Sequence, residues 1–141
     1  MKLFERVLAS FNKQKFMHYI NAELKIVEHG FCEIHLPFND NLTQQNEYFH
    51  AGVIGTIADT AAGYAAYTLM NADESVLSVE YKLNLLSPAN GESLIVRSQV
   101  IKSGRTLIVC NSNIYAINNN IETLCSTATV TLIALKNYKK I

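Results

Sequence analysis

The sequence predicts an α+β fold in which a mostly antiparallel sheet is covered on one face by one long helix. Six runs alternate between apolar and polar residues, as half-buried strands do. Short turns join neighbouring runs, and such turns can connect only antiparallel strands. A single stretch, residues 50–71, is long and apolar enough to form the major helix that must cover the sheet.

The first part of the chain supplies a short helix and two strands. Apolar side chains recur at helical spacing over residues 2–13, which predicts an amphipathic helix within the N-terminal segment 1–15. Residues 18–28 and 30–36 alternate and meet at a Gly, which predicts a hairpin. The following residues, 37–49, are rich in turn-forming side chains and predict a loop that leads into the long helix.

Four further strands follow the long helix. We expect them at residues 75–86, 92–102, 105–117 and 121–135, separated by Pro88–Gly91, Ser103-Gly104 and Asn118–Asn120. One helix cannot cover a six-stranded sheet, so the remaining apolar surface is predicted to meet a second copy of the chain. Two-fold dimers are the commonest arrangement of this kind.

Length and charge limit the possible functions. The 141 residues predict a single domain over residues 1–141. Twelve Lys and Arg residues balance twelve Asp and Glu residues, so nothing attracts the chain to nucleic acid or to an anionic membrane. No apolar window is long enough to span a bilayer. The three cysteines are widely spaced and form no metal-binding pattern, which predicts a cytoplasmic protein without metal or cofactor.

Residues 49–66, FHAGVIGTIADTAAGYAA, contain a single charge, the carboxylate of Asp59. Burying a carboxylate without partners is costly, so Asp59 is either paired or functional. Two interpretations remain open: small neighbours bring the helix close to the sheet, or they leave a slot in which a substrate passes the carboxylate. The residues within about 40° of Asp59 around the helix are all small: Gly52, Gly55, Gly63 and Ala66.

The start of the same helix is a second candidate for chemistry. The first amides of a helix lack internal partners and carry a partial positive charge. Ala51 and Gly52 are small, so a substrate carbonyl could approach these amides as in an oxyanion hole. Asp59 lies about 10 Å from the amide of Ala51 by helical rise, which is too far for both to act on one carbonyl. We therefore expect a site shared between two subunits.

These segments together resemble a known family. HAGVIGTIADTAAGYAA resembles the "HGG…D" segment of hotdog-fold acyl-CoA thioesterases of the phenylacetate-pathway (PaaI-like) type. SVEYKLNLLSPANGE, residues 78–92, and KSGRTLIVCNSNIYA, residues 102–116, resemble the elements that follow in that family. The resemblance implies a hotdog fold, with a curved antiparallel sheet wrapped around a central helix. It also implies homodimers, often paired into tetramers, that hydrolyse an acyl-CoA at the dimer interface.

The resemblance also implies roles for individual residues. Asp59 lies nine positions after His50, as the catalytic carboxylate does in the family, and would be a general base or a nucleophile. Ala51 stands in place of the first Gly of the motif, and its amide would bind the thioester oxygen. Gly52 matches the second Gly, and Ser78 falls where some relatives carry a Ser that assists the attacking water.

The polar position before the motif departs from the family pattern. Relatives often carry Asn six residues before the His, where this chain has Gln44. Gln44 is our first candidate for that role and Asn46 the alternative. His50 either orients the substrate or caps the helix. Tyr48 either lines the pocket or packs as a hydrophobic side chain within the loop.

Basic residues after the helix are candidates for CoA binding. Lys102 and Arg105 flank a turn where the family has basic residues near the CoA phosphates, although exposed charges are equally common in turns.

Glu80 shares the polar phase of its strand with Ser78, Lys82 and Asn84, which predicts a solvated or interface face.

Other functions compete with hydrolysis. A non-catalytic acyl-CoA-binding hotdog module is the main alternative. A dehydratase would need a His beside an acid, but His50 and Asp59 lie about 180° apart around one helix. The sequence leaves the acyl group, the pathway, and the choice between dimer and tetramer open.

Overall fold

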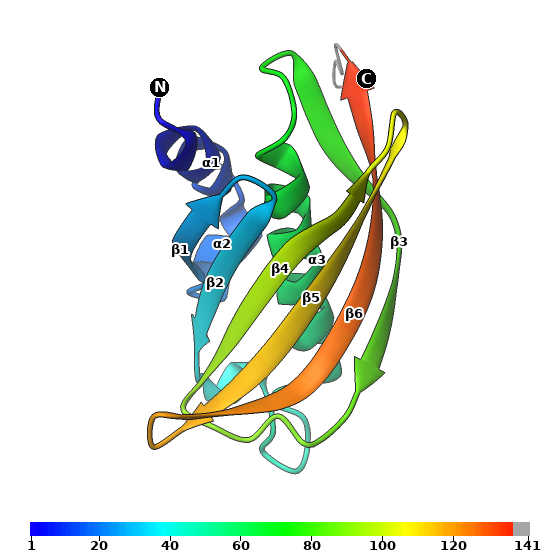
Figure 1. Cartoon of the computed structure of the whole chain (residues 1–141). Helices are drawn as coiled ribbons and strands as arrows, with labels where there is room; N and C mark the ends of the chain where they lie inside the picture. Colours follow the sequence, from blue (N-terminus) through cyan, green and yellow to red (C-terminus); the bar gives the residue numbers. More distant parts are fainter. Residues whose placement is uncertain (137–141) are drawn as a thin grey trace.

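A curved sheet of six antiparallel strands wraps around one long helix in the computed structural model, which describes residues 1–136 (Figure 1). The last five residues of the predicted domain, 137–141, lie outside the described residues. The architecture is the predicted α+β fold. Its elements are α1 (Leu3–Phe11), α2 (Lys15–Tyr19), β1 (Glu23–Glu28), β2 (Phe31–Pro37), η1 (Asp40–Leu42), α3 (Ala51–Tyr67), β3 (Glu74–Leu85), β4 (Ser93–Ser103), β5 (Leu107–Asn118) and β6 (Ile121–Lys136).

The strand order of the sheet is β1-β2-β4-β5-β6-β3, and every neighbouring pair is antiparallel. All six strands therefore lie where the alternation of the sequence predicts them, with shifts at their ends. The strand that follows α3 takes the outermost place, so β3 hydrogen-bonds to β6 alone within the sheet. Its other edge is free to meet a partner.

Small side chains let α3 lie close to the sheet. Ala58, Ala61 and Ala62 are completely buried, and the hydroxyl of Ser112 on β5 donates a hydrogen bond of 2.8 Å to the carbonyl oxygen of Ala58. A Cβ atom at position 55 would lie only 2.9 Å from the hydroxyl of Tyr81 on β3, so Gly there allows the close approach. The interpretation of the small residues as a packing device is therefore correct for these positions.

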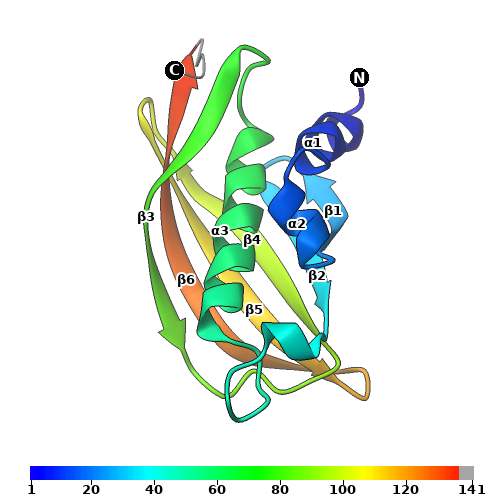
Figure 2. The same cartoon turned by 180° about the vertical axis from the view of Figure 1, so that it is seen from behind.

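The N-terminal segment forms two helices that pack beside α3 (Figure 2). Arg6 of α1 donates hydrogen bonds of 2.9 and 3.0 Å to the carbonyl oxygens of Tyr67 and Met70, and its guanidinium lies 4.8 Å from the centre of the Tyr67 ring. Because the last carbonyls of a helix lack internal partners, Arg6 satisfies this end of α3 and joins it to α1.

Two boundaries differ from the prediction. The strand expected from residue 18 begins only at Glu23, because Lys15–Tyr19 forms the helix α2. Met17 and Ile20, three residues apart, are buried in the core, and this helical packing overrides the alternation that continues into β1. The long helix ends at Tyr67 rather than at residue 71. No helix within residues 1–136 has the length and apolarity needed to cross a bilayer.

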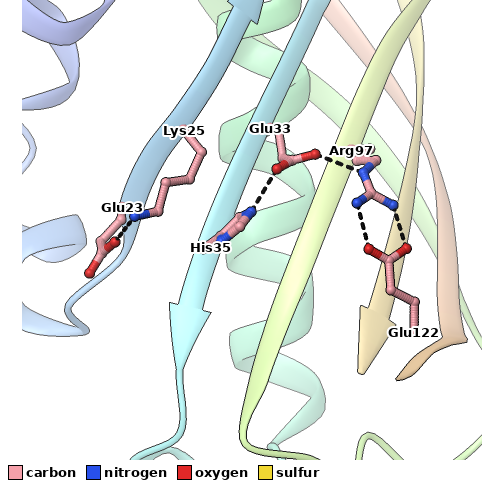
Figure 3. Close-up of polar contacts among 6 residues, drawn as sticks. All are labelled: Glu23, Lys25, Glu33, His35, Arg97 and Glu122. Carbon is pink, nitrogen blue, oxygen red and sulfur yellow. Dashed lines mark hydrogen bonds and ion pairs between the residues drawn. The ribbon is translucent and has the colours of Figure 1, made fainter. Parts of the chain in front are cut away.

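An ion network joins three strands on the face of the sheet turned away from α3 (Figure 3). Glu33 bonds His35 at 2.6 Å and Arg97 at 2.7 Å, and Arg97 forms two bonds of 2.7 Å with Glu122. Bidentate pairing of this kind is the strongest form of a salt bridge. Hydrogen bonds to Glu122 and Glu33 raise the pKa of Arg97, and the bond to Arg97 lowers the pKa of Glu122.

Candidate active site

The carboxylate of Asp59 lies in the middle of α3 and is bound by a hydroxyl from the edge strand. Ser78 on β3 donates a hydrogen bond of 2.5 Å from its Oγ to Oδ1 of Asp59. Oδ2 of Asp59 has no hydrogen bond to any residue within 1–136. Asp59 is thus held in place through one oxygen and has the other available to accept a proton.

A bulge in β3 turns Ser78 toward the helix. Ser78 pairs with Leu132, whereas Glu80 pairs with Thr131, so the register shifts at Val79. The prediction that Ser78 shares a face with Glu80, Lys82 and Asn84 is therefore wrong. The extra residue places Ser78 on the helix side, while the three others follow the opposite phase. Since a bulge reorients a single side chain, the alternation of the sequence could not show it.

A cavity of about 490 Å³ opens beside Asp59 and Ser78. Its lining includes residues of β3 and residues near the junction of α1 and α2, two parts of the chain that lie on either side of α3 in Figure 2. Gly63, one turn after Asp59, leaves room for it. Of the small residues around Asp59, only Gly63 lines this cavity, and passage of a substrate along it stays a prediction. Its lining consists of Ser10, Gln14, Asp59, Thr60, Gly63, Tyr64, Tyr67, Ala72, Glu74, Ser75, Val76, Leu77, Ser78 and Leu132.

The start of α3 leaves one amide without an internal partner. His50 is the N-cap, and its Nδ1 accepts a hydrogen bond of 2.8 Å from the amide of Gly52. The next two amides, of Val53 and Ile54, donate to the carbonyl oxygen of His50 at 3.0 and 3.2 Å. The amide of Ala51 has no hydrogen bond to the described residues. Of the first four helical amides, Ala51 is thus the one available to a ligand, and Gly52 is not.

His50 therefore acts as a capping residue in this structure. Its Nδ1 must be unprotonated to accept from Gly52, so the neutral ring carries its hydrogen on Nε2. A Cβ atom at position 52 would lie 3.0 Å from Nδ1, so Gly at this position makes room for the imidazole ring. The direct contact of His50 with a substrate stays a prediction.

A second cavity, of about 510 Å³, contains the amide end of the helix. Gln44 and Asn46 both line it, and Oε1 of Gln44 accepts a hydrogen bond from the backbone amide of Asn46. This bond leaves the NH₂ group of Gln44 as a donor, which is what the predicted role requires. The other lining residues are Tyr48, Phe49, Ala51, Ile54, Leu85, Leu86, Ser87, Pro88 and Ala89.

The two cavities share no residue. One chain therefore holds a carboxylate site at Asp59 and a separate amide site at Ala51. The close packing of Gly55 against Tyr81 lies between them along α3. This agrees with the expectation, from helical rise, that one chain cannot bring both groups to one carbonyl.

The two basic residues predicted to bind CoA lie away from both cavities. Lys102 is the last residue but one of β4 and Arg105 lies in the exposed β4–β5 turn, and neither lines the carboxylate or the amide cavity. This end of the sheet is beside the last turn of α3, because Gly30 bonds both Thr68 and Val100. Within one chain, Lys102 and Arg105 are thus far from the first turn of α3, and their contact with CoA stays a prediction.

The side chains at the far side of the carboxylate cavity were not predicted from the sequence. Tyr64 receives a hydrogen bond of 2.8 Å from Nε2 of Gln14, and its hydroxyl lies 3.3 Å from Oγ of Ser10. The partners are 50 and 54 residues apart, so no spacing rule could have paired them.

Among residues 1–136, no three His, Cys, Asp or Glu side chains converge as metal ligands.

Residues 46–123 match the family model described as the thioesterase superfamily. The chain belongs to the thioesterase superfamily. A thioesterase family protein from Silicibacter pomeroyi has a crystal structure that superposes with a TM-score of 0.93 at 39% identity, covering 96% of this chain and 99% of that one. A protein from Saccharolobus solfataricus named as a candidate esterase is 30% identical over 82% of this chain and 75% of its own length.

The PaaI protein of E. coli, from the phenylacetic acid degradation operon, shares the fold. Its structure superposes with a TM-score of 0.83, covering 94% of this chain and 93% of that chain, at 15% identity. The resemblance to hotdog-fold thioesterases is thus confirmed, and the likeness to PaaI is one of fold. Membership of the thioesterase superfamily, together with these relatives, supports a hydrolase that acts on thioesters.

Proposed function

We propose that this thioesterase hydrolyses an acyl-CoA to the free acid and CoA. The observation that carries the proposal is the Asp59 carboxylate, fixed by Ser78 through one oxygen and open to a cavity through the other. As a general base, Asp59 removes a proton from water while the water oxygen bonds to the carbonyl carbon. The C–S bond then breaks, and the departing thiolate of CoA takes up a proton. As a nucleophile, Asp59 would instead form an anhydride that water opens.

The negative charge that develops on the carbonyl oxygen needs a donor. The amide of Ala51 is the available one, and the NH₂ group of Gln44 lines the same cavity. Because this cavity is separate from that of Asp59, we propose that the partner subunit of a two-fold dimer supplies it. Each dimer would then have two sites, each with Asp59 and Ser78 from one subunit and Ala51 from the other.

The edge strand β3 supports such a dimer. Leu77 and Val79 are 42 and 56% exposed on this edge strand, and Tyr81, which packs against Gly55, is still 48% exposed. Exposed apolar edges of this kind are normally covered by a partner. The proposal includes a homodimer and, as the sequence resemblance implies, the pairing of dimers into a tetramer. It also includes contacts of Lys102 and Arg105 with the acyl-CoA.

A reducing compartment is part of the same proposal. The three cysteines are free and buried, as in proteins of the cytoplasm. The acyl-CoA pools on which such an enzyme would act are compatible with that location.

The test measures release of free CoA from a panel of acyl-CoAs by the wild type and by Asp59→Asn. We expect the variant to lose about 100-fold or more of kcat, the usual contribution of a general base. Asp73→Asn is the matched control, because Asp73 is exposed and lines neither site cavity. Wild-type rates in Asp59→Asn would refute the proposal. Binding of CoA esters without turnover by the wild type would favour the non-catalytic acyl-CoA-binding module.

A further inference from the structure

The far side of the carboxylate cavity is polar and is built partly by the N-terminal segment. Ser10 of α1 and Gln14, which precedes α2, reach over α3 and meet the hydroxyl of Tyr64. All three side chains line the same cavity as Asp59. We call Ser10, Gln14 and Tyr64 the polar wall. Ser78 lines the same cavity, so a group that extends from the reacting carbonyl through the cavity can reach the polar wall.

The polar wall has hydrogen-bonding capacity left over. Gln14 uses Nε2 to donate to Tyr64, while its Oε1 has no hydrogen bond to the described side chains or backbone. The oxygen of Tyr64 accepts from Gln14, so its own proton is available either to Ser10, at 3.3 Å, or to a ligand. A ligand hydroxyl could therefore accept from Tyr64 and donate to Oε1 of Gln14 at the same time.

The tyrosine hydroxyl remains protonated and thus remains a donor. Burial raises the pKa of Tyr64, although the hydrogen bonds from Ser10 and Gln14 act in the opposite direction. Tyr64 itself is only 5% exposed. An alkyl chain lying against this wall would cover donors and acceptors without replacing their bonds to water, which is unfavourable. A hydroxyl in the same place would satisfy them.

We propose that the polar wall determines which acyl group the enzyme accepts, and that Gln14 and Tyr64 select an acyl group that carries a hydroxyl at its distal end. This inference rests on the proposed thioesterase function of Asp59. Tyr64 follows Asp59 by five residues, so the two positions are about 7.5 Å apart along α3 and about 140° apart around it. The selected acyl group must therefore extend around the helix, since its hydroxyl must reach the wall while its carbonyl stays at Asp59.

The experiment compares matched pairs of acyl-CoAs that differ only in a terminal CH₃ or OH. The pairs are hexanoyl-CoA with ω-hydroxypentanoyl-CoA, heptanoyl-CoA with ω-hydroxyhexanoyl-CoA, and octanoyl-CoA with ω-hydroxyheptanoyl-CoA. We expect the wild type to prefer the hydroxyl member of at least one pair by about tenfold in kcat/KM, the usual effect of a satisfied against an unsatisfied hydrogen bond. In Gln14→Leu and in Tyr64→Phe the preference should fall to about onefold or reverse.

Two controls separate selectivity from stability. Gln99→Leu makes the same chemical change on an exposed strand position that lines neither site cavity, and it should keep the wild-type preference. Thermal unfolding of each variant shows whether it is folded, and either Gln14→Leu or Tyr64→Phe is sufficient for the test. A merely structural role, in which the wall fastens α1 and α2 to α3, would lower Tm without changing the ratio within a pair.

The same pairs are titrated calorimetrically into Asp59→Asn, so that selectivity is also measured without turnover. Tighter binding of the hydroxyl member, lost in the double variant with Gln14→Leu, supports the inference even if no thioester is hydrolysed and the proposed function fails. Hydrolysis with equal kcat/KM for both members of every pair overturns the inference and leaves the proposed function intact. A preference that persists in Gln14→Leu and Tyr64→Phe also overturns it, as does the absence of any binding.

Discussion

Replacing His50 separates a capping role from a direct role in binding substrate. His50→Asn keeps a side-chain acceptor that can bond the amide of Gly52, whereas His50→Leu keeps bulk but removes the acceptor. Losing a helix N-cap costs about 1 kcal/mol, which for a chain of this size lowers Tm by about 3 to 5 °C. The same loss frees the first turn, so the amide of Ala51 is held in position only part of the time. If about the same 1 kcal/mol is lost from the stabilisation of the transition state, kcat/KM should fall about fivefold.

The assay pairs thermal unfolding with the rate of CoA release. We expect His50→Asn to stay within about threefold of the wild-type kcat/KM, and His50→Leu to lose both stability and rate by the amounts above. The reasoning would be refuted if His50→Asn kept the wild-type Tm but lost most of its activity. That outcome would mean that the imidazole ring itself contacts the substrate.

Two further predictions follow from the titrating groups. Glu122→Gln should lower Tm at about pH 7 and should do so progressively less as the pH falls below the ordinary pKa of 4.5. Arg97 lowers the pKa of Glu122 in the folded state, so its stabilisation is complete above 4.5 and is lost as the pH falls through the lowered pKa. A Tm difference that grew on acidification would contradict this. The three cysteines should react with a thiol dye at about pH 8 only after denaturation, because they are buried and burial raises the pKa of Cys32 and Cys110 to about 12. Rapid labelling of the native protein would show that this reasoning fails.

The regular part of the fold could be predicted because periodicity and burial agree there. The strands after α3 were predicted from alternation and from the turn residues that separate them, whereas the pairing of β3 with β6 was not predicted. Asp59 stood out for a similar reason, as one charge among small residues of a helix. The separation of Asp59 from Ala51 needed only the rise of an α-helix.

The remaining features depend on contacts between distant parts of the chain. Met17 is apolar in either conformation, and only its packing against the core shows that Lys15–Tyr19 is helical. The bulge at Val79 changes the direction of Ser78 without any Gly or Pro to mark it. His50 lies outside the usual set of capping residues, but its place beside a helix start favoured a capping or packing role, and only the structure shows the bond to Gly52.

The place of β3 at the edge of the sheet has a consequence for biosynthesis. β3 is held by β6 alone, and β6 follows it in the chain only after the whole β4–β5 hairpin. During synthesis, Ser78 leaves the ribosome long before Leu132, the residue that it pairs with. A nascent chain thus carries α3 and its carboxylate for some seconds without the serine in place, at typical rates of about 5–20 residues per second. The Asp59–Ser78 hydrogen bond therefore forms late during biosynthesis, when β6 completes the sheet.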